Sequence, residues 1–206
     1  FKLKKMMRKF LFFIIGGGLL LVLVFWFFSI KNGAVRVNQE VNKEWGNVET
    51  SYQRRNDLIG NLVKTVQGSA DFEKSTLEAV IKARSEATSV KIDPTNMTPE
   101  QLTQFNQAQG NLNSSLSRLL VTVEQYPDLK ANQNFLKLQD ELASTENQIL
   151  TARTRFNESV QKYNNYILVF PNSIFLGNYK EKPYFDAVAG AEKPVDVEFD
   201  FNNEKK

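Results

Sequence analysis

The chain has 206 residues, with 26 Lys and Arg against 23 Asp and Glu, and it contains neither cysteine nor histidine. This composition excludes disulfide bonds, zinc sites built on Cys or His, thiol nucleophiles and histidine acid–base catalysis. Five cations precede Phe10, so the remaining 21 face 23 acidic residues and provide no basic surface for nucleic acid. About 175 residues follow the N-terminal apolar stretch, enough for one domain with a core.

The apolar stretch, residues 10–30, carries no charged side chain. At ~1.5 Å per residue, a helix of this length measures roughly 30 Å, the hydrocarbon thickness of a bilayer. Aromatic residues gather at both ends, as in permanent anchors. The run is longer than the apolar core of a signal peptide, and residues 29–34 offer only a weak cleavage site, so we expect a retained transmembrane helix rather than a cleaved leader.

Charge asymmetry predicts the orientation of this span. The cations of residues 1–9 outnumber those just after the span, which places the N-terminus in the cytoplasm and the remaining chain in the periplasm or outside the cell. Within the span, residues 16–18 are all glycine. They allow close approach of a second helix or, equally, local flexibility, because their spacing is not that of a GxxxG motif.

Apolar residues recur every three or four positions from Ala34 to about Ala70, and no proline separates them from the span. The pattern predicts one long amphipathic helix that continues the span, with Gly33 as the expected bend. Around Gly68 the sequence allows either a break or a continuous helix, and the apolar stripe resumes at Leu77.

Two proline-containing signals delimit the later helices. Residues 98–101, Thr-Pro-Glu-Gln, have the form of a capping box and predict a helix start. The next interruption is Tyr126–Pro127, since proline disfavours helical geometry at the residue before it. A last long helix is predicted from about Lys130 to Pro171, after which the periodicity fades.

The predicted fold class is all-α: a transmembrane helix followed by an antiparallel bundle of three or four long helical segments and an irregular C-terminal tail. The predicted organisation is a basic cytoplasmic tail (1–9), the transmembrane helix (10–30), the bundle (34–170), and a loop or tail packed on the bundle (171–206).

Several polar residues lie within the apolar stripes of the predicted bundle. Because an unpaired buried charge is costly, we expect pairs between helices: Arg55 or Arg84 with Glu146, and Arg153 with Glu73. Setting helix register is the best-attested role of such pairs, and a ligand or catalytic site is the alternative. No motif marks a nucleophile, and we predict no catalytic residue, cofactor or metal. The predicted structural cluster consists of Arg55, Asp57, Glu73, Arg84, Glu146, Arg153, Asn157 and Asn164.

Two stretches resemble the signatures of the LemA family. The first is residues 52–63, continued by Glu73 and by Ala83–Arg84, and the second runs from the Tyr-Pro-Asp-Leu-Lys-Ala of residues 126–131 to Phe170–Pro171. The resemblance covers nearly the whole chain. The departures from the family pattern are Gly60 where proline is usual, Phe72 where a histidine often precedes the Glu, and Phe156 where tyrosine is common.

The resemblance implies a bacterial single-pass membrane protein with a helical-bundle domain, in a family without an established activity. One branch of the family resembles a magnetosome-membrane organiser, which implies scaffolding rather than catalysis. We therefore expect a non-enzymatic scaffold or interaction protein, anchored in the lipid bilayer of the cytoplasmic membrane and self-associating. The alternatives are an adaptor subunit for an unknown membrane-protein partner and, with less support, an enzyme that uses the Arg/Glu cluster.

Overall fold

The computed structural model describes residues 2–69 and 72–185, and all regular structure within these ranges is helical, which confirms the all-α prediction. Residues 186–206 of the predicted tail lie outside the described residues. The helices are α1 (Lys2–Gln67), α2 (Lys74–Ser89), α3 (Pro99–Val123), α4 (Pro127–Lys130), α5 (Gln133–Leu168) and α6 (Asn172–Phe175).

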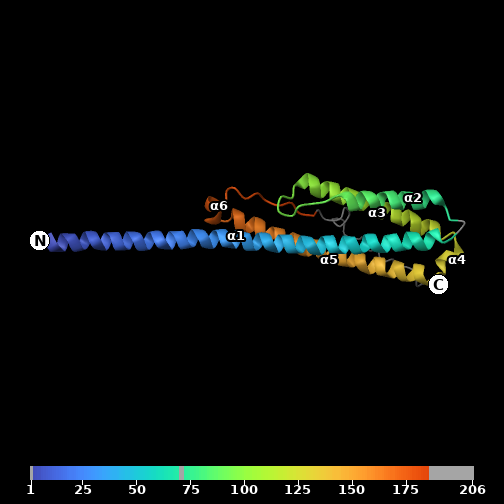
Figure 1. Ribbon diagram of the computed structural model, residues 1–206, viewed down its shortest axis with the longest axis horizontal. Helices are drawn as coiled ribbons and strands as arrows, with labels where there is room; N and C mark the ends of the chain where they lie inside the picture. The colour runs from blue at the N-terminus through green and yellow to red at the C-terminus, as the bar shows by residue number, and fades with distance from the viewer. Residues whose placement is uncertain (1, 70–71, 186–206) are drawn as a thin grey trace, which may run out of the picture.

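Helix α1 runs without interruption from the apolar stretch into the bundle (Figure 1). The prediction of a bend at Gly33 was therefore wrong. Gly33 is instead a point of close approach, because a Cβ atom there would lie 1.9 Å from the Tyr166 hydroxyl oxygen of α5. That hydroxyl donates a hydrogen bond of 3.1 Å to the carbonyl oxygen of Ile30. Glycine at position 33 allows two helices to touch.

Local signals in the sequence explain where α1 ends and α3 begins. Helix α1 ends at Gln67, so the structure contains the break that was one of the two options around Gly68. Helix α3 begins with the predicted capping box: the Thr98 hydroxyl accepts from the Gln101 amide at 3.3 Å, and the Gln101 side chain accepts from the Thr98 amide at 3.1 Å. These two bonds satisfy backbone donors that a helix start otherwise leaves unpaired.

The interruption at Tyr126–Pro127 consists of the short helix α4 and a tight connection to α5. Helix α5 begins at Gln133, three residues later than predicted, because Asn132 caps it. The Asn132 side-chain oxygen accepts from the amides of Asn134 and Phe135 at 3.0 and 3.2 Å. A capping side chain competes with helical pairing at its own position and so fixes the boundary.

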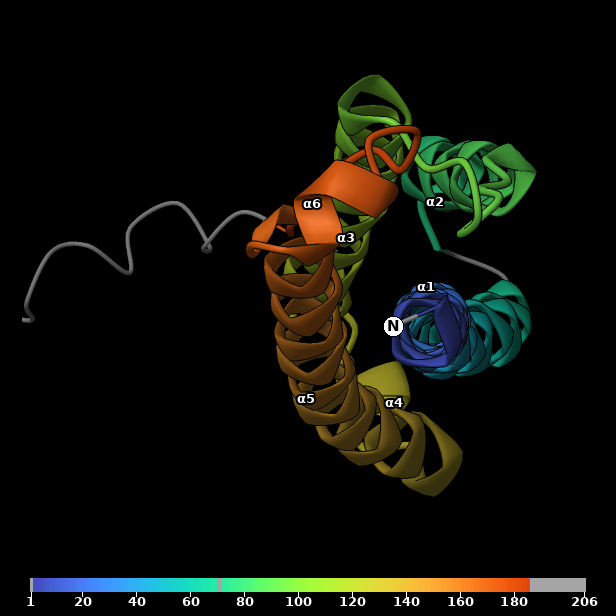
Figure 2. The ribbon, with the colours of Figure 1, turned by 90° about the vertical axis from the view of Figure 1, so that its left-hand side faces the viewer.

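Helices α1, α2, α3 and α5 alternate in direction and form an antiparallel bundle (Figure 1). Helix α1 lies along α5, and α2 lies along α3. In the end-on view α1 and α2 lie on one side of the bundle, and α3 and α5 lie on the other (Figure 2). Helix α2 covers only the part of α1 remote from the apolar stretch. We call that half of the bundle distal and the half next to the apolar stretch proximal.

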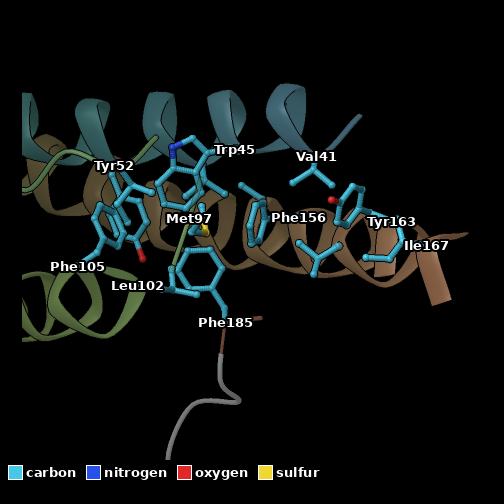
Figure 3. Packing of buried hydrophobic residues seen from close by; sticks show 14 of the residues in the cluster. Val41, Trp45, Tyr52, Met97, Leu102, Phe105, Phe156, Tyr163, Ile167 and Phe185 are labelled. Carbon is cyan, nitrogen blue, oxygen red and sulfur yellow. The ribbon is translucent and has the colours of Figure 1, made fainter. Parts of the chain in front are cut away.

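The two halves have separate cores. The distal core is mainly aliphatic, whereas the proximal core is rich in aromatic side chains (Figure 3). Representative distal residues are Ile59, Leu62, Val66, Val80, Leu112, Leu119 and Leu142. Representative proximal residues are Val41, Trp45, Tyr52, Met97, Leu102, Phe105, Phe156, Tyr163 and Phe185.

Irregular chain takes the place of α2 in the proximal half. Residues 90–98, between α2 and α3, contribute Ile92 and Met97 to the proximal core. After α6 the chain turns at Leu176–Tyr179 and runs back along the bundle to Phe185 (Figure 1). Residues 180–185, which we call the C-terminal strap, close the core at this end.

Candidate functional site

A layer of polar side chains separates the proximal core from the distal core. Its centre is Arg55 of α1, which is only 3% exposed. The Arg55 Nη1 atom donates to Glu146 Oε1 of α5 at 3.0 Å, and its Nη2 atom donates to the Gln109 side chain of α3. The Gln109 amide in turn donates to the Ala87 carbonyl of α2 at 3.3 Å. One connected network therefore ties all four bundle helices at a single level.

The buried Arg55 guanidinium lies against an aromatic ring and is only partly hydrogen-bonded. Its guanidinium carbon lies 4.9 Å from the centre of the Tyr52 ring, and burial raises the pKa of the Tyr52 phenol, while Arg153 and Arg55 act in the opposite direction. Arg55 Nε and Asn56 Oδ1 are buried without a hydrogen-bond partner in the described part of the chain. A buried cation of this kind needs its carboxylate, since desolvating an unpaired charge is expensive.

A second set of polar residues on α5 binds mainly backbone groups. Asn157 donates to the carbonyl of Phe185 at 3.0 Å and accepts from its amide at 2.8 Å. Asn164 forms the same two bonds with the backbone of Lys182, each at 2.9 Å. Seven helical residues rise about 10.5 Å and three extended residues span about 10 Å, so the two repeats match.

Lys182 fixes the strap from the other side. Its ammonium group donates to the carbonyls of Pro94 and Thr95 and lies 5.2 Å from the centre of the Tyr163 ring. The residue is 5% exposed, and burial lowers the pKa of its amine. Tyr163 also donates to the carbonyl of Lys180 at 3.2 Å. Side chains thus satisfy the backbone groups of a segment that has no secondary structure of its own.

The strap delivers Phe185 to the middle of the proximal core (Figure 3). Its ring lies parallel to that of Trp45 with centroids 6.0 Å apart, and it meets the Phe156 ring edge-on at 5.4 Å. The guanidinium carbon of Arg153 lies 4.6 Å from the centre of the same ring. Asn157 and Arg153, both singled out in the sequence, therefore hold one aromatic residue in place.

The remaining members of the predicted cluster lie apart from these groups. Arg84 donates from Nε to the Asn56 carbonyl at 2.7 Å and thereby links α2 to α1. Asp57 is exposed and accepts from Gln53 on its own helix, and Glu73 is exposed beyond the end of α1, where it accepts from Ser75. Arg153 and Glu73, which were expected to pair, lie in different halves of the bundle: Arg153 is beside Phe185 in the proximal half, and Glu73 is beyond the distal end of α1.

Gln109 and Lys182 were not identified from the sequence as members of these networks. Gln109 carried a readable signal, since it interrupts the apolar stripe of α3 between Phe105 and Leu112. Lys182 carried none, because it lies in a segment without periodicity.

The chemistry available in these networks is limited because most of their charged and hydrogen-bonding groups are paired with one another or with backbone. Arg55 and Glu146 neutralise each other, and the two asparagines are occupied by backbone. A surface groove of about 570 Å³ opens beside the layer, lined partly by Tyr52, Asn56 and Gln109. Among the described residues no group of three or more carboxylate, His or Cys side chains could hold a metal ion.

Comparison with known proteins places the chain. The LemA family profile matches residues 44–199. The chain is 26% identical over 183 residues to the magnetosome proteins MamQ 2 of Paramagnetospirillum magneticum and MamQ of Magnetospirillum gryphiswaldense, covering 80% of this chain and 67% of each relative. It is also 26% identical over 164 residues to protein LemA of Metamycoplasma hominis, covering 80% of this chain and 71% of that relative. The chain therefore belongs to the LemA family.

Proposed function

We propose that this LemA-family chain is a non-catalytic scaffold, anchored by residues 10–30 in the cytoplasmic membrane and self-associating there. Its bundle stands outside the cytoplasm and presents its distal end to other components of the envelope. The observation that carries this proposal is the continuity of α1 from the apolar stretch through Gln67.

Because α1 is a single continuous helix, it joins the membrane anchor rigidly to the bundle. From Ile30 to Gln67 the helix rises about 55 Å at ~1.5 Å per residue, and α5 braces it along that length. The hydrogen bond from Tyr166 to the Ile30 carbonyl and the close approach at Gly33 join α5 to α1 at the base. A rod of this kind holds its tip at a fixed height above the membrane, which a scaffold requires and a tethered enzyme does not.

The polar networks support a structural role over catalysis. Glu146 pairs with a buried arginine that also binds Gln109, and this arrangement specifies which faces of the four helices meet.

Self-association through the span is the form of assembly we favour. Residues 10–29 of α1 are exposed in the isolated chain, and a Cβ atom at Gly16, Gly17 or Gly18 would have no neighbour within 4 Å. Small residues let helix backbones approach closely in lipid, where packing rather than hydrophobicity drives association. The relatives named as magnetosome proteins are consistent with a membrane-organising role, and the positive-inside bias supports an external bundle.

The absence of cysteine from the sequence makes disulfide trapping a clean test. Single cysteines at positions 16 to 24, introduced one at a time, should form crosslinked dimers in native membranes at positions that share one helix face. A cysteine at the exposed Asn47 serves as the control and should remain uncrosslinked. Light scattering in mild detergent should give the mass of an oligomer. A monomeric mass together with no self-crosslink at any position would refute self-association, and crosslinks to one different protein would favour the adaptor function.

A further inference from the structure

The segment that connects α5 to α6, together with α6 itself, is unusually apolar for a surface loop. No charged side chain occurs between Lys162 and Lys180. Within this run the exposed fractions are 54% for Leu168, 54% for Val169, 77% for Phe170 and 67% for Ile174. Elsewhere in the described part of the bundle, exposed large apolar residues such as Ile81, Val121 and Leu150 are dispersed over different helices. Dispersed apolar residues are ordinary, whereas a cluster marks a contact surface.

The position of this loop indicates what it contacts. Helix α6 lies beside α1 at the base of the bundle, where α1 leaves it (Figure 1). The Phe175 ring lies 5.8 Å from the ring of Trp26 and 5.8 Å from that of Phe27, centroid to centroid. If the hydrocarbon layer begins at Phe10, its ~30 Å thickness ends near Ile30, and Phe27 lies about 5 Å inside that boundary. The loop therefore reaches the outer edge of the bilayer.

The loop has the internal pairing that such a place demands. Its amides at Ser173, Ile174 and Leu176 donate to loop carbonyls at 2.9 to 3.2 Å, and Asn172 donates from its side chain to the Tyr166 carbonyl at 3.0 Å. Unpaired backbone groups are costly away from water, and these bonds remove much of that cost.

The polar surroundings fit a headgroup layer above the loop. The Lys31 ammonium lies 5.8 Å from the centre of the Phe27 ring and 5.2 Å from that of Tyr179, the arrangement of an interfacial cation and aromatic belt. Lys162 and Lys180 flank the uncharged run, while Glu158 and Glu181 are the nearest acids in that part of the sequence.

We infer that Leu168–Phe175 is a second membrane contact, in which Leu168, Val169, Phe170 and Ile174 enter the outer leaflet beside the span. The bundle then touches the bilayer at two points, and α5 as well as α1 is fixed against it. This inference rests on the proposed anchoring through residues 10–30, because only that anchoring places the loop at the membrane surface.

Single-cysteine variants labelled with an environment-sensitive fluorophore test the contact. The variants are Ile174→Cys in the loop, Leu20→Cys in the span, and Val121→Cys as a control that is 69% exposed on α3 of the distal half. Each full-length chain is placed alone in nanodiscs of phosphatidylcholine and phosphatidylglycerol in equal parts. Quenching is then measured with brominated lipid and with aqueous iodide.

The label at position 174 should be quenched by brominated lipid and be severalfold less sensitive to iodide than the label at position 121. If position 20 is quenched by lipid but position 174 matches position 121, the loop contact is refuted while the anchor remains. If position 20 is not quenched, the anchoring itself fails. Protection of position 174 that appears only with several chains per disc would assign the surface to a second copy, and this too overturns the inference.

Introducing a charge gives an independent measurement. Ile174→Asp in a Phe170→Cys background should increase iodide access to the label at position 170, because a carboxylate favours water over the leaflet. Asn178→Asp, at an exposed position beyond α6, is the matched control and should leave that access unchanged. Equal access in all three proteins would contradict lipid contact by the loop.

Discussion

The distal and proximal halves of the bundle enclose their cores with different kinds of backbone. In the distal half four helices surround aliphatic side chains, and each helix satisfies its own backbone. In the proximal half α1 and α5 are joined by irregular chain, residues 90–98 and the C-terminal strap, around an aromatic core. Irregular backbone brings unpaired amides and carbonyls, and Asn157, Asn164 and Lys182 bind them. Asn157 and Asn164 are therefore present on the buried face of α5 because the irregular chain packed there needs hydrogen-bond partners for its backbone.

The largest effect should come from removing the ring that the strap inserts. Phe185→Ala should lower the free energy of unfolding by about 3–5 kcal/mol, because the 3% exposed side chain leaves a cavity between Trp45 and Phe156. Urea unfolding of the full chain in detergent, followed by circular dichroism, measures this change. Glu181→Ala, at an exposed position of the same strap, is the control and should stay within about 0.5 kcal/mol.

Hydrogen exchange of the Phe185→Ala variant tests whether the loss of stability is confined to the proximal half. Amides of the strap and of residues 90–98 should exchange faster in Phe185→Ala, while those of α2 should change little. Equal acceleration in both halves would contradict the division into two cores.

Much of the distal half was readable from the sequence, because apolar periodicity reports helix faces directly. The interruption at Tyr126–Pro127, at the distal end, was predicted because it depends on adjacent residues, and the capping box at Thr98 in the proximal half was predicted for the same reason. The proximal half was less readable. Residues 180–185 have no periodic pattern, so nothing local indicates that Asn157 and Asn164 would bind their backbone. The bend expected at Gly33 was wrong because the reason for glycine there is Tyr166, which is 133 residues away in the chain.

The layer between the halves gives the next largest effect. Glu146→Ala leaves Arg55 buried without its carboxylate and should destabilise the chain by about 2–3 kcal/mol, less than is usual for a fully buried pair because the Glu146 side chain is 38% exposed. Glu146→Gln keeps an acceptor for the guanidinium and should cost about 1 kcal/mol. Thermal unfolding in detergent measures both. An unchanged midpoint for the alanine variant would mean that water replaces the carboxylate.

The asparagines of α5 should contribute less individually. Asn164→Ala removes the partner of both the amide and the carbonyl of buried Lys182, and should cost about 1–3 kcal/mol. Asn165→Ala, at the exposed neighbouring position, controls for the loss of an amide side chain on the same helix and should be nearly neutral. Faster hydrogen exchange at Lys182 should accompany the first substitution and not the second. Equal stability of the two variants would show that Asn164 does not contribute to holding the strap, which would then depend on Asn157, Lys182 and the aromatic contacts.

Two glycines of α1 provide the finest comparison, because they differ only in what faces them. A Cβ atom at Gly46 meets nothing within 4 Å, so Gly46→Ala should stabilise the chain by about 0.5–1 kcal/mol through helix propensity alone. A Cβ atom at Gly33 would lie 1.9 Å from the Tyr166 hydroxyl, so Gly33→Ala should instead cost about 1–3 kcal/mol by overpacking the junction of α1 and α5. Combining Gly33→Ala with Tyr166→Leu should recover most of that loss, since the hydroxyl and ring carbon nearest the new methyl are removed. The midpoints of thermal unfolding of the three variants test this comparison. An equal increase in midpoint for Gly46→Ala and Gly33→Ala would mean that α5 does not brace α1 at its base. The rod that the proposed scaffold depends on would then begin only further up the bundle.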